Sequence, residues 1–263
     1  MKMLLTLALF CYFLAMLKFF MHLAVRRQFF HALAVIMALL GFGLHTAGLM
    51  AISAKTGHGP YTTPFEYTSF FAWTTMAVLL VFAVFLRRIA SVGAFVSPLA
   101  FLLMAYSMLL PEDGGGGQVR AFWLTMHYTV SFLALSSFIV VFAASAMYLI
   151  QENELKHHRF SGLFKRMPDL DTLDLLLNRA LVFGFPLISV GVLSGFIWSH
   201  KLFGSLMGPK PVRVLPIILV WFVYALLMFG RTVIGWRGHK IALVGLGGFA
   251  LAAAAVGIHL AVR

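Results

Sequence analysis

Eight long apolar runs recur along this chain of 263 residues, and mostly short connections separate them. A helix needs about 20 mostly apolar residues to cross the hydrocarbon core of a bilayer. A chain with this many such runs is typical of a protein that crosses the membrane repeatedly. We therefore predict spanning helices at about residues 3–24, 29–53, 65–87, 90–110, 121–150, 180–200, 214–230 and 241–262.

The composition indicates the same class of protein. Hydrophobic residues make up 62% of the chain and charged residues 11%, whereas a soluble domain has about 25% charged residues. We predict an all-α, polytopic membrane helix bundle that forms one integral membrane domain over residues 1–263. The single cysteine, Cys11, excludes an intrachain disulfide and a thiolate metal cluster. Arg26 and Arg27 follow the first apolar run, which has no small-residue cleavage site, so we expect a retained helix.

The basic residues predict an orientation. The net charge of +12 would suggest a nucleic-acid partner in a soluble protein. Here the basic residues lie between apolar runs, so the positive-inside rule explains them, and we expect contact with membrane lipid and none with nucleic acid. Twelve Lys and Arg residues fall on one side of an eight-helix path and seven on the other. This split predicts a multi-pass protein of the bacterial inner (cytoplasmic) membrane with both termini outside.

One long connection, residues 151–179, differs from the others. It combines acidic residues (Asp169, Asp171 and Asp174) with a leucine-rich stretch and ends at Arg179. Mixed charge beside apolar residues is typical of an amphipathic helix that lies in the membrane interface. We predict such a helix on the cytoplasmic side, where it would be the main candidate for a protein-contact surface.

Two of the ten histidines, His127 and His259, lie inside predicted spans at the same depth below the outer boundary, about 6–9 Å at 1.5 Å per residue. His45 lies slightly deeper. An ionisable residue inside a span suggests a functional site. Two neutral imidazoles suit the axial positions of a haem iron, and no nearby carboxylate or thiolate completes a tetrahedral site. The alternative is that each imidazole bonds a backbone carbonyl of a neighbouring helix. The residues alone leave both interpretations open.

The remaining polar features near the outer side are ambiguous. Glu66 begins an apolar helix within an aromatic stretch that ends at Trp73, and Trp123 lies near the same level. A carboxylate at a helix N-terminus is favoured by the helix dipole, and aromatic residues commonly form an interfacial belt. The functional interpretation is that Glu66 and the aromatic residues shape an outer pocket. His58 and His200 would be the next ligand candidates to pair with His45.

Four stretches of the sequence together resemble the CcsA/ResC cytochrome c assembly proteins and their HemX-like relatives. They are Gly57 to Pro60 with Thr63 to Tyr67, Phe122 to His127, Leu173 to Arg179 with Gly184 to Gly195, and Gly235 to Gly238 with Gly257 to His259. By this resemblance, His127 and His259 correspond to the two external haem-ligand histidines of the family. The resemblance implies a bundle of membrane helices around an outward-facing haem cavity.

The chain departs from the family's ligases at two places. The loop from His200 to Lys210 has no tryptophan and no acid, whereas ligases carry a tryptophan-rich, haem-presenting segment there. Phe229 lies near the place where ligases have a further histidine. These departures resemble the HemX-like branch and argue against covalent haem attachment by this chain alone.

We therefore expect a non-enzymatic membrane protein that binds b-type, non-covalent haem and takes part in haem handling or cytochrome c assembly. His127 and His259 would be the iron ligands, with His45, Glu66 and Trp123 around the pocket. The alternative implied by HemX-like proteins is a membrane regulator of glutamyl-tRNA reductase and haem biosynthesis. A third hypothesis is a b-type, quinone-linked oxidoreductase. Its second haem would need His22 and His31, the only further candidates.

Overall fold

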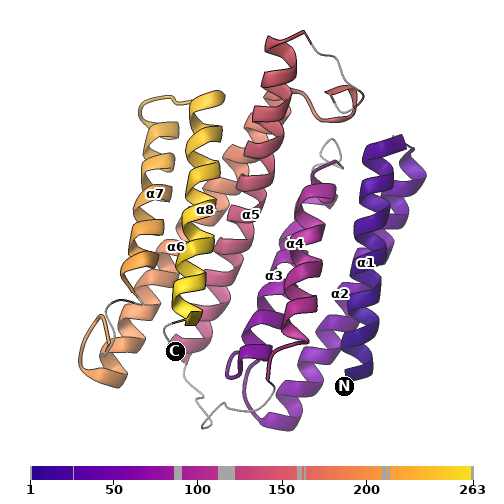
Figure 1. The fold of residues 1–263 in the computed structure, drawn as a ribbon. Coiled ribbons are helices and arrows are strands. Elements are labelled where there is room, and N and C mark those ends of the chain that lie inside the picture. The colour runs from indigo at the N-terminus through magenta and orange to yellow at the C-terminus, as the bar shows by residue number, and fades with distance from the viewer. Residues whose placement is uncertain are drawn as a thin grey trace. The chain divides into compact units, whose positions relative to one another are not determined.

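A computed structural model describes residues 2–25, 27–85, 91–111, 122–158, 162, 164–208, 212 and 214–261, without the side chains of 84–85 and 256–261. Within these ranges the regular structure is helical throughout, which confirms the predicted all-α class (Figure 1). The helices are α1 Lys2–Val25, α2 Gln28–Thr56, α3 Pro64–Phe85, α4 Gly93–Ser107, α5 Phe122–Lys156, α6 Leu170–Phe203, α7 Leu215–Thr232 and α8 His239–Ala261, with a 3-10 turn η2 at Phe164–Arg166.

Each predicted apolar run corresponds to one of these helices. Six helices, α1, α2, α3, α5, α6 and α7, are long and apolar enough to cross a membrane. The other two, α4 and α8, are apolar but have shorter described segments, Gly93–Ser107 and His239–Ala255. The chain is therefore a multi-pass membrane protein.

The helices form two compact units. Unit 1 comprises Met1–Arg120 with Phe160–Pro168, and unit 2 comprises Ala121–Arg159 with Asp169–Arg263. In unit 1 the helices pack in a ring, because α1 contacts α2 and α4, and α3 contacts the same two helices. In unit 2, α5 contacts α6 and α8, and α7 contacts the same two helices. Each unit is thus a four-helix bundle.

In the segment 151–179, residues 159–161 and 163 lie outside the described residues, and the described ones form no separate amphipathic helix. Its first residues continue α5 to Lys156, and its last ten are the first turns of α6. Asp169 caps α6, because its carboxylate accepts a hydrogen bond from the Thr172 amide at 2.7 Å. Leu173, Leu176 and Leu177 lie buried in the bundle, so the leucine stripe faces protein. Helical periodicity identifies such a stripe but does not show whether the helix continues into a neighbouring span.

An ion pair fixes the end of unit 2 where α7 turns into α8. Arg231 of α7 donates to both carboxylate oxygens of Asp174 on α6, at 2.8 and 2.6 Å. The same guanidinium donates to the Asn178 side chain and to the Trp236 carbonyl. The Gly238 amide also donates to Asp174. This bidentate clamp joins α6, α7 and the turn before α8, the helix that carries His259.

Candidate functional site

His127 lies on α5 with one ring nitrogen held by the neighbouring helix. Its Nδ1 is 2.7 Å from the carbonyl oxygen of Gly191 on α6. Because a carbonyl only accepts hydrogen bonds, Nδ1 carries the proton, and the neutral ring keeps its lone pair on Nε2. Among the described residues Nε2 has no hydrogen-bond partner. This contact is the backbone hydrogen bond expected of a purely structural imidazole, and it also leaves Nε2 in the form that a metal ligand requires.

Two small residues of α6 make room for this arrangement. A Cβ atom at Gly195 would lie 2.8 Å from both Cε1 and Nδ1 of His127. A Cβ atom at Gly191 would lie 2.5 Å from the Ser131 hydroxyl on α5. The Ser194 hydroxyl shares its single proton between the Val190 carbonyl at 2.8 Å and the Gly191 carbonyl at 3.0 Å. Glycine here permits the close approach of α5 and α6 that brings the imidazole to its acceptor.

Trp123 lies one turn before His127 on α5, and Lys201 of α6 covers its ring. The Lys201 ammonium is 5.6 Å from the centroid of the Trp123 indole, the distance of a cation–π contact. This places a positive charge and an aromatic face about one helical turn from the imidazole. The sequence predicted Trp123 near this level without identifying Lys201 as its partner.

The side chain of His259 lies outside the described residues, but its helix is placed. His239 at the start of α8 contacts Glu152 near the end of α5, and Phe249 stacks on Phe142 at 4.3 Å. These contacts show that α8 runs antiparallel to α5. Continued along both helices, this register brings the backbone of position 259 to the level of about residue 132, which is about 7.5 Å along α5 from His127.

His45 lies in unit 1 and is fully buried with both ring nitrogens engaged. Its Nδ1 is 3.2 Å from the Tyr12 hydroxyl, and its Nε2 is 2.9 Å from the Ser69 hydroxyl. Ser69 donates its own proton to the sulfur of Met104 at 3.8 Å. The Ser69 oxygen therefore accepts from Nε2–H, and Nδ1 accepts from Tyr12. This network links α1, α2, α3 and α4 and leaves neither nitrogen of His45 for a ligand.

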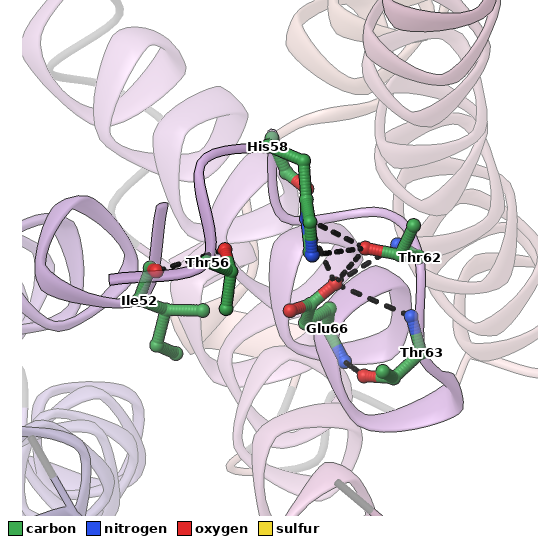
Figure 2. Close-up of polar contacts among 7 residues, drawn as sticks. Ile52, Thr56, His58, Thr62, Thr63 and Glu66 are labelled. Carbon is green, nitrogen blue, oxygen red and sulfur yellow. Dashed lines mark hydrogen bonds and ion pairs between the residues drawn. The ribbon is translucent and has the colours of Figure 1, made fainter. Parts of the chain in front are cut away.

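Glu66 is also in unit 1, buried at the start of α3. Its amide donates to the Thr63 hydroxyl at 3.1 Å, and its Oε2 accepts from the Thr63 amide at 3.2 Å. This reciprocal pair is a capping box, with Pro64 as the first helical residue. Oε2 also accepts from the Thr62 amide and hydroxyl, at 2.9 and 2.6 Å. Figure 2 shows the imidazole of His58 directed toward this carboxylate, with Nδ1 3.9 Å from Oε2.

His22 and His31 lie together at the α1–α2 turn. Their ring centroids are 5.3 Å apart, and His22 Nδ1 is 3.1 Å from the Arg27 carbonyl oxygen.

The predicted site residues belong to different units. His127, Trp123 and the backbone of His259 are in unit 2, and His45 and Glu66 are in unit 1.

A family model for the cytochrome c assembly protein matches residues 61–255, which is most of the chain and includes helices of both units. This chain belongs to the cytochrome c assembly protein family. The family membership confirms the resemblance inferred from the four sequence stretches.

Relatives of this family member include both kinds of protein that the sequence resembles. The cytochrome c biogenesis protein CcsA of Chlamydomonas reinhardtii is 28% identical over 204 residues. That match covers 74% of this chain but 56% of the algal protein, so the chain spans little more than half of that relative. CcsA of Guillardia theta is 27% identical, with 74% and 71% of the two chains covered. The protein HemX of Brevibacillus brevis is 27% identical over 230 residues, covering 86% and 83%.

Sequence reasoning missed two parts of the site. The pattern Thr63-Pro64-Phe65-Glu66 is a capping-box signature that could have been recognised, because Ser or Thr three residues before Glu marks a helix start. The carbonyl that accepts the hydrogen bond of His127 was harder to identify from the sequence. A backbone carbonyl has no signature in the sequence, and only the small residues Gly191 and Gly195 indicated that two helices approach closely there.

Proposed function

We propose that this protein is a haem-binding, non-enzymatic membrane component of cytochrome c assembly, with haem iron held between His127 and His259. The observation that carries the proposal is the 2.7 Å contact between His127 Nδ1 and the Gly191 carbonyl. It leaves the lone pair on Nε2, the form of imidazole that binds iron. Family membership and the CcsA relatives supply the biological context.

The residues of unit 2 fit a haem by their chemistry. Haem brings four nitrogen donors of its own and needs one or two imidazoles to complete its coordination. His127 supplies one, and the helix register supports His259 as the other. Lys201 over Trp123 places a cation near the same level, which suits the propionates of a porphyrin. When bound, haem would supply a redox-active iron. The chain would orient His127 through Gly191 and exclude water by close packing of α5 and α6.

A regulatory role is the second candidate, because HemX of Brevibacillus brevis matches across most of both chains. The resemblance to HemX-like proteins implies control of glutamyl-tRNA reductase. The end of α5 offers a surface for such a partner, since Leu155 is 39% exposed and the Lys156 side chain 60% exposed. The Lys and Arg distribution supports a cytoplasmic position for this end and an outer position for both termini.

The test of the haem proposal is the absorption spectrum of the purified full-length protein. We expect reduced b-type bands and a low-spin oxidised spectrum. His127→Ala and His259→Ala should each convert the haem to five-coordinate or water-ligated iron, and the double substitution should abolish the low-spin spectrum. His157→Ala is the matched control, because that ring bonds only the Asn153 carbonyl one turn before it on an exposed helix end. A low-spin spectrum that survives the double substitution would refute the ligand pair.

A further inference from the structure

Two histidines meet at the turn between α1 and α2, apart from the site proposed for haem. His22 lies in the last turn of α1, and His31 is the fourth residue of α2. Their rings are in contact, with centroids 5.3 Å apart and planes tilted by 43°. Both residues belong to unit 1, whereas the haem ligands proposed above belong to unit 2.

The hydrogen bond of His22 determines where its proton lies. Nδ1 is 3.1 Å from the Arg27 carbonyl oxygen, an atom that only accepts. Nδ1 therefore carries the proton of the neutral ring, and Nε2 keeps the lone pair. The Arg27 carbonyl is itself held in place, because it also accepts from the Phe30 amide at 3.1 Å. The turn thus orients the buried ring of His22 and leaves Nε2 in the form that ligates a metal.

His31 has a buried ring nitrogen that the described residues leave without a hydrogen-bond partner. This atom is Nδ1. Buried polar atoms are nearly always paired, so an exception in a packed turn points to a ligand. The ring is supported from one side by the buried Phe19 of α1, with centroids 6.2 Å apart. Phe19 packs so closely on Gly93 of α4 that a Cβ atom would not fit there.

Two neutral imidazoles at this separation can share one metal ion. Imidazoles that ligate the same ion at about 2.0 Å have ring centroids about 5–6 Å apart. The 5.3 Å between the centroids of His22 and His31 lies in this range. Within the described ranges no group of three His, Cys, Asp or Glu side chains gathers. The ion must therefore be one that binds with few protein ligands, unlike the zinc of structural sites, which takes four.

Monovalent copper is the ion that suits these donors. Imidazole is a good ligand for copper, and Cu(I) needs as few as two such ligands. The nearby charges agree with this choice, because Lys18 lies one turn before His22 and Arg27 directly precedes α2. A divalent ion would meet twice the repulsion from these cations. We propose that Nε2 of His22 and Nδ1 of His31 bind Cu(I) at the α1–α2 turn.

The experiment uses the full-length chain carrying His127→Ala and His259→Ala, so that the pair proposed for haem cannot bind the metal. The purified protein competes for Cu(I) with bicinchoninate, a coloured chelator, in the presence of ascorbate. We expect one Cu(I) per chain to move to the protein, with an X-ray absorption spectrum of two nitrogen ligands at about 2.0 Å. His22→Ala and His31→Ala should each weaken binding about tenfold or more, because even groups that only orient a ligand contribute about 10–100-fold.

His157→Ala is the matched control. Its exposed ring bonds only the Asn153 carbonyl, at 2.9 Å, so this substitution should leave the Cu(I) affinity unchanged. Helix content by circular dichroism, measured without copper, checks that each variant is folded. Where an alanine variant loses helix content, His22→Gln or His31→Gln replaces it, since glutamine keeps most of the side-chain volume.

Two results would overturn the proposal. One is a protein that takes no Cu(I) from bicinchoninate, and the other is Cu(I) binding that substitution of His22 and His31 leaves unchanged. Zinc that binds in preference to Cu(I), and is lost on the same substitutions, would overturn the choice of metal. None of these results bears on the haem proposal, because His127 and His259 are absent from the protein tested.

Discussion

The close contact between Gly195 and His127 gives the most discriminating prediction. Replacing Gly195 by Ala puts a methyl group 2.8 Å from Cε1 and Nδ1 of the imidazole. Ordinary carbon contacts are about 3.5–4.0 Å, so the ring must move by roughly 1 Å or rotate. Either motion lengthens the 2.7 Å hydrogen bond to the Gly191 carbonyl. The substitution therefore acts on the orientation of the ligand without removing it.

The expected magnitude combines three effects. Overpacking of a close contact costs about 1–3 kcal/mol, and a weakened hydrogen bond costs about 0.5–1.5 kcal/mol. Alanine is favoured over glycine in a helix by about 1 kcal/mol, which offsets part of the cost. The net loss is about 0.5–3.5 kcal/mol. If most of it falls on the ligating position of His127, haem affinity should fall roughly 2- to 300-fold, since 1.4 kcal/mol is about a factor of ten.

The assay is haem titration of purified Gly195→Ala followed by the low-spin absorption bands. Gly43→Ala is the control, because a Cβ atom at Gly43 of α2 meets nothing within 4 Å. It should leave haem affinity unchanged and stability equal or higher. If Gly195→Ala binds haem as tightly as the unsubstituted protein with the same spectrum, His127 is not oriented by Gly191 and the reasoning fails.

Two further predictions rest on the packing of the helices, and a third rests on the distribution of Lys and Arg. Asp174→Ala removes the carboxylate that pairs with Arg231, whose side chain is 12% exposed. This should lower the free energy of unfolding by about 2–4 kcal/mol. The measurement is the thermal unfolding transition in detergent, which should occur at a lower temperature. Tyr12→Phe removes the hydroxyl that bonds the buried His45, and it should lower the free energy of unfolding by about 1–3 kcal/mol while haem binding stays unchanged. Loss of haem from this variant would mean that His45 is a ligand after all. A reporter fused after the last residue should behave as external, and a cytoplasmic signal would reverse the predicted orientation.

The helices themselves could be predicted closely from the sequence. A run of about 20 apolar residues has few alternatives to a spanning helix, and the eight predicted runs correspond to α1 through α8. The spans could be found because membrane insertion depends on length and hydropathy, both of which are local in the chain. The matched depth of His127 and His259 comes from the same counting and stays a prediction.

What could not be predicted depends on contacts between distant residues. The Leu173 stripe was visible, but its burial in the bundle requires knowledge of α5 beside it. The partners of His45 come from helices 33 and 24 residues away in sequence. Each imidazole in a span could bind a ligand, a hydroxyl or a carbonyl, and the sequence did not distinguish these cases. The structure gives His45 two hydroxyl partners and His127 one carbonyl partner.

The network around His45 also determines how protons can move through unit 1. Each group in it has one proton to donate, from Tyr12 to His45, from His45 to Ser69 and from Ser69 to the sulfur of Met104. A proton wire conducts only if every member can accept a proton on one side and release one on the other. A thioether accepts a hydrogen bond weakly and has no proton to release. The series of hydrogen bonds therefore ends at Met104, and all of its bonds point in the same direction. The centre of this bundle therefore holds its helices together through hydrogen bonds without offering protons a route along them.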